Sequence, residues 1–208
     1  MNKLEPTRLK KSLKRCLPFW RKCLATFVAL VFLSSDFALA GDASSLEFQV
    51  KGACLVKFGM FVEWPPAANG SADKSPFVIG ILGNDPFGKL FDDSVAKEKV
   101  NGRQVLVKRG NSAAELLDCQ IVFISYPEMD RVKAAITQFA THGVLTVSDA
   151  PGFARMGGMV GFIREAGKEG VKVRFEINTE IAGQSGLKLS SKLLQVGRVV
   201  TSGKPDHG

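Results

Sequence analysis

Residues 76–88 read Pro-Phe-Val-Ile-Gly-Ile-Leu-Gly-Asn-Asp-Pro-Phe-Gly, and this stretch decides the fold class. Its first part, Phe77–Leu82, is short and continuously apolar, which is typical of a strand covered on both faces. Asp85 is a favourable helix N-cap, and Pro86 suits the first helical position. The stretch therefore predicts a buried strand that turns directly into a helix.

The same alternation of strand and helix continues along the chain. Further strands are expected at residues 103–107, 119–124 and 144–147, and helices at 112–117 and 127–140. Strands that alternate with helices predict a three-layer α/β domain, with a mainly parallel sheet flanked by helices.

The carboxyl ends of the strands mark where such a sheet binds a ligand. Asp85, Ser125 and Asp149 lie at these ends, so they form the expected rim of any pocket. A helix N-terminus after Asp85 is suited to anions. However, this junction carries an acidic residue and lacks the glycine spacing of a dinucleotide site, which favours a structural role.

From residue 156 the pattern changes to an antiparallel hairpin. A glycine-rich apolar segment, 156–163, is followed by a turn at 165–170 and by the alternating stretch 171–178, Val-Lys-Val-Arg-Phe-Glu-Ile-Asn. One face of this strand is apolar, and the other carries Arg174, Glu176 and Asn178. These three side chains are a solvated edge, a polar network that holds the C-terminus, or a surface for a partner.

The C-terminal segment is expected to return to this strand. Ser190 is a suitable N-cap for a short helix that continues through Val200. Ser190, Ser191 and Lys192 therefore join Arg174, Glu176 and Asn178 as candidate binding residues. Residues 201–208 are expected to form a disordered tail.

The first forty residues have the pattern of a signal peptide. A basic leader precedes an apolar run at 24–33, and Ala38-Leu39-Ala40 supplies the small residues that signal peptidase reads. We expect cleavage between Ala40 and Gly41, export to the periplasm, and a single domain over residues 41–200. Two alternatives remain open: Met1 is not the true start, or the leader stays uncleaved as an anchor.

Residues 44–64 predict the first helix of the exported protein, which ends at Trp64-Pro65-Pro66. Apolar side chains occur around most of its circumference. A helix of this kind is either enclosed in the core or has an exposed side that meets a partner, and we favour the core.

Charge and cysteine content exclude several function classes. The chain has 28 Lys and Arg against 20 Asp and Glu, but the leader holds eight of the basic residues and two of the acidic ones. The remaining 20 against 18 give no case for nucleic-acid binding. Cys54 and Cys119 remain after cleavage, either as a disulfide or as two buried thiols, and they are too few for a CxxC metal framework.

No Ser/His/Asp or Cys/His catalytic set can be assembled from this sequence without His142. The only histidines are His142, in a predicted loop, and His207, in the tail. A hydrolase would have to depend on Asp149 or His142. We therefore expect a protein that is not an enzyme and that uses no cofactor and no metal.

Several segments, in order, resemble the blocks of the YfiR-like family of periplasmic proteins. The opening block is Ala53-Cys54-Leu55-Val56-Lys57-Phe58 with Phe61-Val62-Glu63-Trp64-Pro65. Later blocks are 77–88, 101–103, 119–125, 145–153, 157–159, 173–178 and 189–194. The resemblance runs from about Val50 to Val200, which is effectively the whole exported domain.

The resemblance implies a non-catalytic periplasmic regulator. Such a protein binds the sensor domain of a membrane diguanylate cyclase of the YfiN type and represses it, which lowers cyclic di-GMP and restrains biofilm formation. It also implies a homodimer. The alternative function is a small-molecule-sensing domain that serves another membrane receptor, such as a histidine kinase.

This chain departs from the family pattern in two places. Many members have Asn where Gly161 stands, so a polar contact is missing here. Cys119 matches a family cysteine position, whereas Cys54 occupies a site that is commonly aromatic. The resemblance thus weakens the case for a Cys54–Cys119 disulfide, and a redox switch built on two intramolecular bridges does not carry over.

Overall fold

The computed structural model describes residues 38–65, 75–167 and 170–203. The chain divides into two compact units, residues 1–45 and 46–208, and the second unit contains the sheet. The following description concerns this second unit, although its first helix, α2 (Ala38–Phe61), begins upstream.

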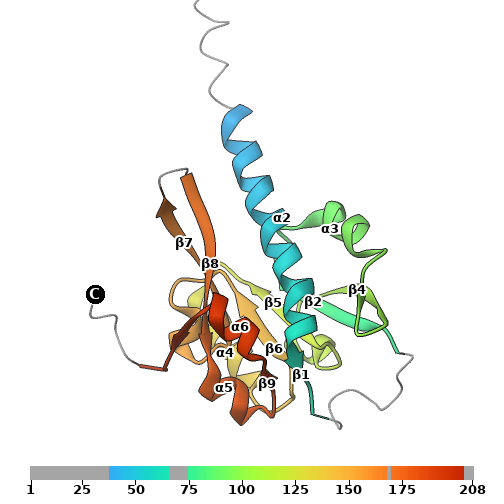
Figure 1. The fold of residues 1–208 in the computed structure, drawn as a ribbon, viewed down its shortest axis with the longest axis vertical. Coiled ribbons are helices and arrows are strands. Elements are labelled where there is room, and N and C mark those ends of the chain that lie inside the picture. The colour runs from blue at the N-terminus through green and yellow to red at the C-terminus, as the bar shows by residue number, and fades with distance from the viewer. Residues whose placement is uncertain (1–37, 66–74, 168–169, 204–208) are drawn as a thin grey trace, which may run out of the picture. The chain divides into compact units, whose positions relative to one another are not determined.

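An eight-stranded sheet forms the centre of the described residues, in the order β10-β8-β7-β6-β5-β2-β4-β3 (Figure 1). Neighbouring strands from β7 to β4 are parallel, and β8 runs antiparallel to β7. The strands are β2 (Phe77–Gly83), β3 (Lys99–Val100), β4 (Arg103–Gly110), β5 (Ile121–Ser125), β6 (Leu145–Ser148), β7 (Val160–Gly167), β8 (Gly170–Asn178) and β10 (Arg198–Val200). The expected fold class, α/β with a mainly parallel sheet and a C-terminal antiparallel hairpin, is confirmed.

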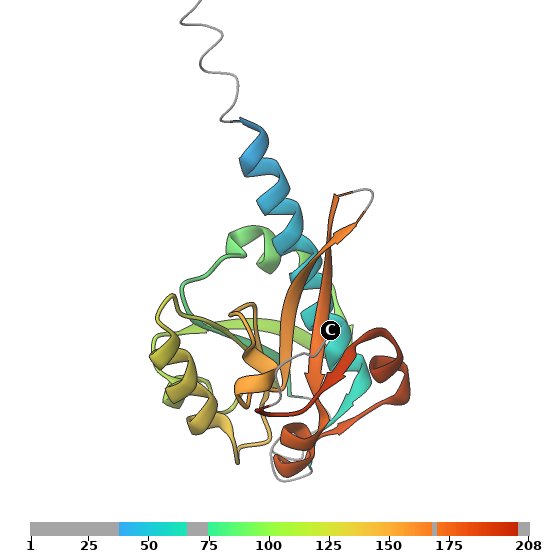
Figure 2. The ribbon, with the colours of Figure 1, turned by 90° about the vertical axis from the view of Figure 1, so that its left-hand side faces the viewer.

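Helices cover both faces of this sheet. Helix α4 (Met129–Phe139), with the short 3₁₀ turns η2 (Ala113–Leu116) and η3 (Phe153–Met156), packs on one face. The other face is covered by α2 together with α3 (Gly88–Val95), α5 (Thr179–Gln184) and α6 (Ser191–Val196). Figure 2 shows α4, in yellow, and the cyan part of α2 on opposite sides of the strands.

The core therefore consists of two apolar clusters separated by the sheet. Phe58, Ile79 and Phe123 belong to the cluster beneath α2. Val122 and Phe139 belong to the cluster beneath α4. Adjacent residues of β5, such as Val122 and Phe123, point to opposite faces, so a central strand must be apolar throughout.

Two element boundaries in the first half of the domain differ from expectation. Helix α2 ends at Phe61, because Val62–Glu63 forms strand β1, which pairs with β9 (Lys188–Leu189) in a separate two-stranded sheet. Helix α3 begins at Gly88 rather than at Pro86. The Asp85 carboxylate accepts hydrogen bonds from the N–H groups of Phe87 and Gly88, so the chain makes a side-chain-supported turn before the helix starts.

The C-terminus contains an unexpected strand. Helix α6 stops at Val196, and β10 then pairs parallel with β8 through Arg198↔Glu176 and Val200↔Asn178. Strand β8 is therefore an interior strand, and the interpretation of its polar face as a solvated edge is wrong for Glu176 and Asn178, which are buried. Ser202 and Gly203 make hydrogen bonds to Asn178 and Arg155.

Gly83 ends β2 at a position where a side chain cannot fit. Its φ is +91°, and a Cβ atom there would lie 2.6 Å from the Ser125 carbonyl oxygen and 2.7 Å from the Tyr126 ring. Gly102 also has a positive φ, +82°, but a Cβ atom would meet nothing within 4 Å. A side chain would be strained by the positive φ at both positions, but only at Gly83 would it also collide with neighbouring atoms.

We expect Gly83→Ala to lower the free energy of unfolding by about 3 kcal/mol, through left-handed strain plus overlap with backbone. Gly102→Ala should cost about 1 kcal/mol, from strain alone. Urea denaturation of the two variants measures the difference. Equal losses would contradict the close approach of β2 to the residues after β5.

Candidate functional site

The carboxyl edge of the parallel strands brings the predicted rim residues to one side of the sheet. Register places Gly83 opposite Ser125, and Ile124 opposite Ser148, so β2, β5 and β6 end together. The Ser125 carbonyl oxygen accepts a hydrogen bond from the N–H of Asn84 at 2.9 Å. The Ser148 hydroxyl donates to the carbonyl of Ile124 at 2.7 Å, which ties β6 to β5.

Asp85 is held in an ion-pair cluster with α3 and β4. Its Oδ2 lies 2.7 Å from Arg109 Nε, and Arg109 also contacts Asp92 at 2.9 Å. Burial alone would raise the pKa of Asp85, but the hydrogen bonds from Arg109, Phe87 and Gly88 outweigh burial and lower this pKa below its ordinary value. Asp85 therefore stays ionised and fixes the turn after β2.

A second cluster surrounds Lys51 of α2, whose side chain is only 3% exposed. Its Nζ lies 2.6 Å from Glu47 Oε1 and 2.7 Å from Asp149 Oδ2, and 4.6 Å from the centroid of the Phe48 ring. Arg164 of β7 closes the cluster through both oxygens of Glu47 at 3.0 and 2.9 Å. Two cations and two anions compensate one another, which a buried ammonium group requires.

Glu47 shows the electrostatic effect of this arrangement. Burial acts to raise its pKa, but hydrogen bonds from Lys51 and Arg164 have the greater combined effect, so the pKa of Glu47 is lowered. Because α2, β6 and β7 each contribute, the cluster fastens α2 to the carboxyl edge of the sheet.

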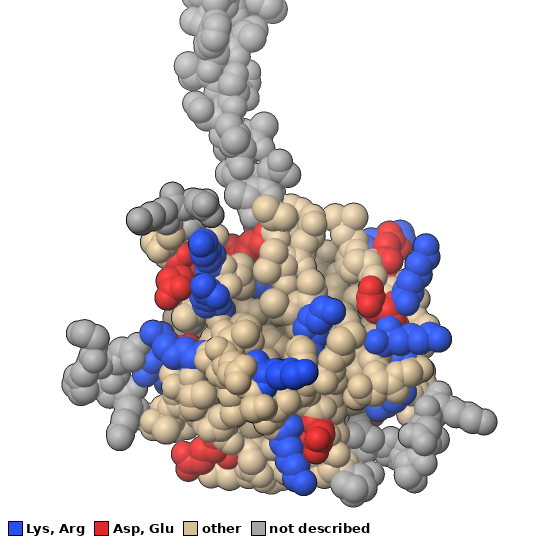
Figure 3. Space-filling model, viewed as in Figure 1, with Lys and Arg blue, Asp and Glu red and all other residues tan. Residues whose placement is uncertain are grey.

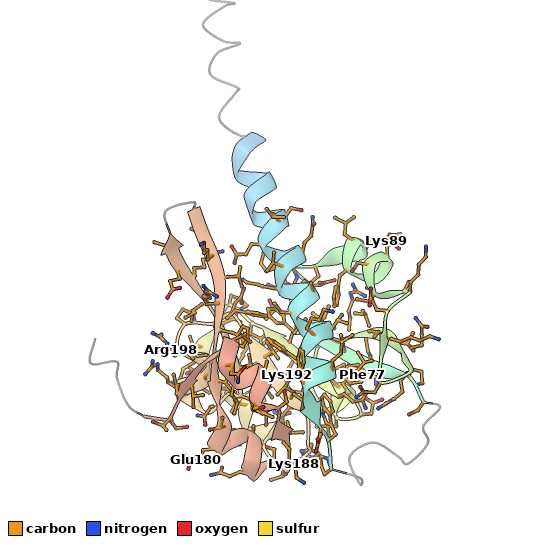
Figure 4. The ribbon with its side chains drawn as sticks, viewed as in Figure 1. Phe77, Lys89, Glu180, Lys188, Lys192 and Arg198 are labelled. Carbon is orange, nitrogen blue, oxygen red and sulfur yellow. The ribbon has the colours of Figure 1, made fainter. Side chains whose placement is uncertain are left out.

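Glu176 forms the third cluster, near the C-terminus. Its side chain is 5% exposed, and Oε1 accepts hydrogen bonds from Arg155 of η3 at 3.0 Å and from Arg198 of β10. Figure 4 labels Arg198 beside this strand. One carboxylate thus connects three elements that are distant in sequence.

Asn178 lies next to Glu176 on the same strand face and is fully buried. Its Nδ2 donates to the carbonyl of Ala154 and to the hydroxyl of Ser202, both at 2.9 Å, and its Oδ1 accepts from the N–H of Ile181, which caps α5. Both N–H donors of this amide and its oxygen thus have partners inside the protein.

Most residues of these clusters lie within a range that matches a known protein family. Residues 48–198 match the model of the YfiR/HmsC-like family, and this range covers most of the described residues. The chain belongs to the YfiR/HmsC-like family. This family is one of periplasmic regulators of diguanylate cyclase signalling, and it is regulatory rather than catalytic.

Other comparisons add little to this assignment. No curated protein matches the chain. One solved structure, a conserved domain protein from Vibrio cholerae O1 biovar El Tor strain N16961, is similar at 14% identity and a TM-score of 0.42. The match covers 61% of this chain and 55% of that one, so the chain spans about half of its length.

The remaining candidate residues of this YfiR/HmsC-like chain do not lie together in one site. Arg174 is exposed and lies 3.5 Å from Glu165 across the hairpin. Ser190 caps α6 by accepting a hydrogen bond from the N–H of Leu193. Ser191 and Lys192 are exposed on α6 and do not meet Glu176, because β10 rather than the start of α6 returns to β8.

Cys54 and Cys119, the cysteines among the described residues, are free thiols, and the structure gives no support to the candidate disulfide between them. Cys54 packs against the core cluster beneath α2, whereas Cys119 is buried in the cluster beneath α4, so the sheet lies between them. Burial, with a contribution from Asp118, raises the pKa of Cys119 to about 12. A thiol of this kind is unreactive.

The family position Gly161 has a steric explanation here. A Cβ atom at Gly161 would lie 3.2 Å from the backbone nitrogen of Ala154 in η3. The close approach of η3 to β7 leaves little space for the Asn that the resemblance leads one to expect.

Three charged residues of these clusters were not predicted from the sequence. Lys51, Arg155 and Arg198 were not candidates, although Lys51 follows Glu47 at the i,i+4 spacing of a helical ion pair. His142 is exposed, and the described residues contain no group of three or more His, Cys, Asp or Glu that would suit a metal ion.

We expect Glu176→Ala to lower the free energy of unfolding by about 2 kcal/mol, since it removes two charge-assisted hydrogen bonds and leaves Arg155 partly buried without that acceptor. Glu165→Ala, which removes a carboxylate from an exposed ion pair on the adjoining strand, should cost under about 0.5 kcal/mol. Chemical denaturation measures both. A neutral Glu176→Ala variant would argue that the network does not hold β10.

Proposed function

We propose that this chain is a non-catalytic periplasmic repressor that binds the sensor domain of a membrane-bound diguanylate cyclase and lowers cyclic di-GMP, and with it biofilm formation. The family match over residues 48–198 carries the proposal. A regulator of this kind acts by stoichiometric binding, so its partner surface matters more than any reactive group. We also propose, from the family resemblance, that it forms a homodimer.

The contacts at the predicted pocket rim support binding of a protein over sensing of a small molecule. The carboxylates of Asp85 and Asp149 already pair with Arg109 and Lys51. A small ligand would have to compete with these internal ion pairs. The alternative function, a sensing domain for a different receptor, therefore receives no specific support from the rim residues.

Export is part of the proposal. The family is periplasmic, and no helix among the described residues is long and apolar enough to cross a membrane. The predicted signal sequence lies mostly outside the described residues, and both it and the domain boundaries 1–40 and 41–200 stay predictions.

Deletion of the chromosomal gene should raise cellular cyclic di-GMP severalfold, because the cyclase loses its repressor. Mass spectrometry of nucleotide extracts measures this, and a plasmid copy should restore the low level. The tagged chain should also retain the cyclase during purification from membranes. Unchanged cyclic di-GMP after deletion, with no cyclase retained, would count decisively against repression.

The exported protein should begin at Gly41, since Ala38 and Ala40 supply the small residues that signal peptidase requires. Intact-mass measurement of periplasmic extract tests this directly. Ala40→Arg should block processing and leave the full-length chain in the membrane fraction. An N-terminus upstream of residue 38 in the periplasm would refute the proposed site.

A further inference from the structure

Between Leu46 and Met60, helix α2 has a largely apolar exposed ridge, with the exposed Gln49 beside it. Leu46 is 62% exposed, Val50 42% and Met60 37%, and Ala53 and Lys57 lie between them at helical spacing. Residues at 46, 50, 53, 57 and 60 recur every three or four positions, so they form one ridge. Lys57 is the only charged member of this ridge.

Helix α6 extends the same surface. The N–H of Ser190 donates to the carbonyl of Phe61 at 2.9 Å, so the start of α6 lies against the end of α2. Lys192 and Val196 are one turn apart on the exposed side of α6, and Val196 is 63% exposed. We call these seven residues the α2–α6 surface: Leu46, Val50, Ala53, Lys57, Met60, Lys192 and Val196.

Figure 3 shows the face of the protein on which α2 and α6 lie. Isolated blue side chains stand on a largely tan centre, and the red carboxylates lie toward its margins. Figure 4 places Lys192 on α6 near α2. Neither Lys57 nor Lys192 forms an ion pair with the described residues.

Helix α4, on the opposite side of the sheet, provides the comparison. Its exposed positions include Asp130, Arg131, Lys133, Thr137 and Gln138, which is the polar surface expected of a helix in contact with water. The contrast with the ridge on α2 indicates that core packing alone does not account for the exposed apolar residues of α2.

The two lysines of the α2–α6 surface indicate which kind of molecule binds to it. A second copy placed on it by a two-fold axis would bring the lysines of both copies into one interface without a carboxylate from the surface itself. Glu47, the acidic residue of α2 nearest the ridge, is already paired with Lys51 and Arg164. A partner complements this surface when it supplies apolar side chains to pack on the ridge and acidic side chains to pair with the lysines.

We propose that the α2–α6 surface binds an acidic amphipathic helix of a partner protein. The straight ridge suits a helix packed along it, and the small side chain of Ala53 lets the two backbones approach closely at the centre. The proposal rests on the proposed function in that the partner is the cyclase, whose sensor region would present the helix.

The test uses the exported protein and two labelled peptides of about 20 residues, since shorter isolated helices are marginal in water. One peptide has a leucine stripe flanked by glutamates, and the other has lysines in place of the glutamates. We expect saturable binding of the acidic peptide by fluorescence anisotropy and none of the basic peptide. Lys57→Glu with Lys192→Glu should weaken binding about tenfold or more, whereas Lys133→Glu on α4 should leave it unchanged.

Each other outcome overturns the proposal. These outcomes are absent binding of the acidic peptide, equal binding of both peptides, or full binding by a double variant whose thermal unfolding is unchanged. Sedimentation of a Val50→Glu variant tests the second copy: conversion of a dimer to monomers would assign the surface to self-association instead.

The same double variant separates this proposal from the proposed function. If the unmodified chain retains the cyclase and the double variant retains it equally, the repressor stands and the surface assignment fails. If the unmodified chain binds the acidic peptide but not the cyclase, the surface stands and the cyclase is the wrong partner.

Discussion

The constraint on which this structure depends is that its central strands are apolar on both faces. Ile121, Val122, Phe123 and Ile124 of β5 are all buried, so the sheet is stable only when helices cover both sides. Helix α4 and the 3₁₀ turns cover one face, and α2 covers much of the other. Because α2 is the first of the described elements and α6 is nearly the last, the two ends of the described domain meet on the same face.

Covering the sheet in this way forces charged groups into the interior, and each is neutralised locally. Lys51 reaches the carboxyl edge beneath α2 and pairs with Glu47 and Asp149. Glu176 is enclosed when β10 joins β8, and it pairs with Arg155 and Arg198. Among the described residues, every buried side-chain nitrogen and oxygen has a hydrogen-bond partner. The polar residues that looked most functional in the sequence are thus used to hold elements together.

Sequence reasoning recovered the local elements better than the long-range contacts. The strand–turn–helix unit at residues 76–95, the central strands and the hairpin were predictable, because continuous or alternating apolar patterns depend on neighbours in the chain. Strand β10 was not, because Arg198–Val200 is three residues long and is defined by pairing with β8, about twenty residues away. The role of Glu176 depended on that pairing. Without β10, its alternation left a solvated edge, a polar network and a partner surface all open, whereas the capping serine of α6 was readable from the local sequence.

The interior charges of this protein already pair with one another. We therefore place the proposed regulatory contact on the surface. A reactive or ligand-binding centre needs polar groups held ready for another molecule, and Lys51, Asp149, Glu176 and Asn178 are instead satisfied within the chain. The apolar ridge of α2 differs, since Leu46, Val50 and Met60 remain exposed on the helix that also anchors the core. A helix whose other side is fixed by the core can present such a ridge without rearranging, and an interface that is ordered before binding loses little conformational entropy when a partner docks. The repressor proposed above would act by binding, and this ridge is the kind of surface that binding requires.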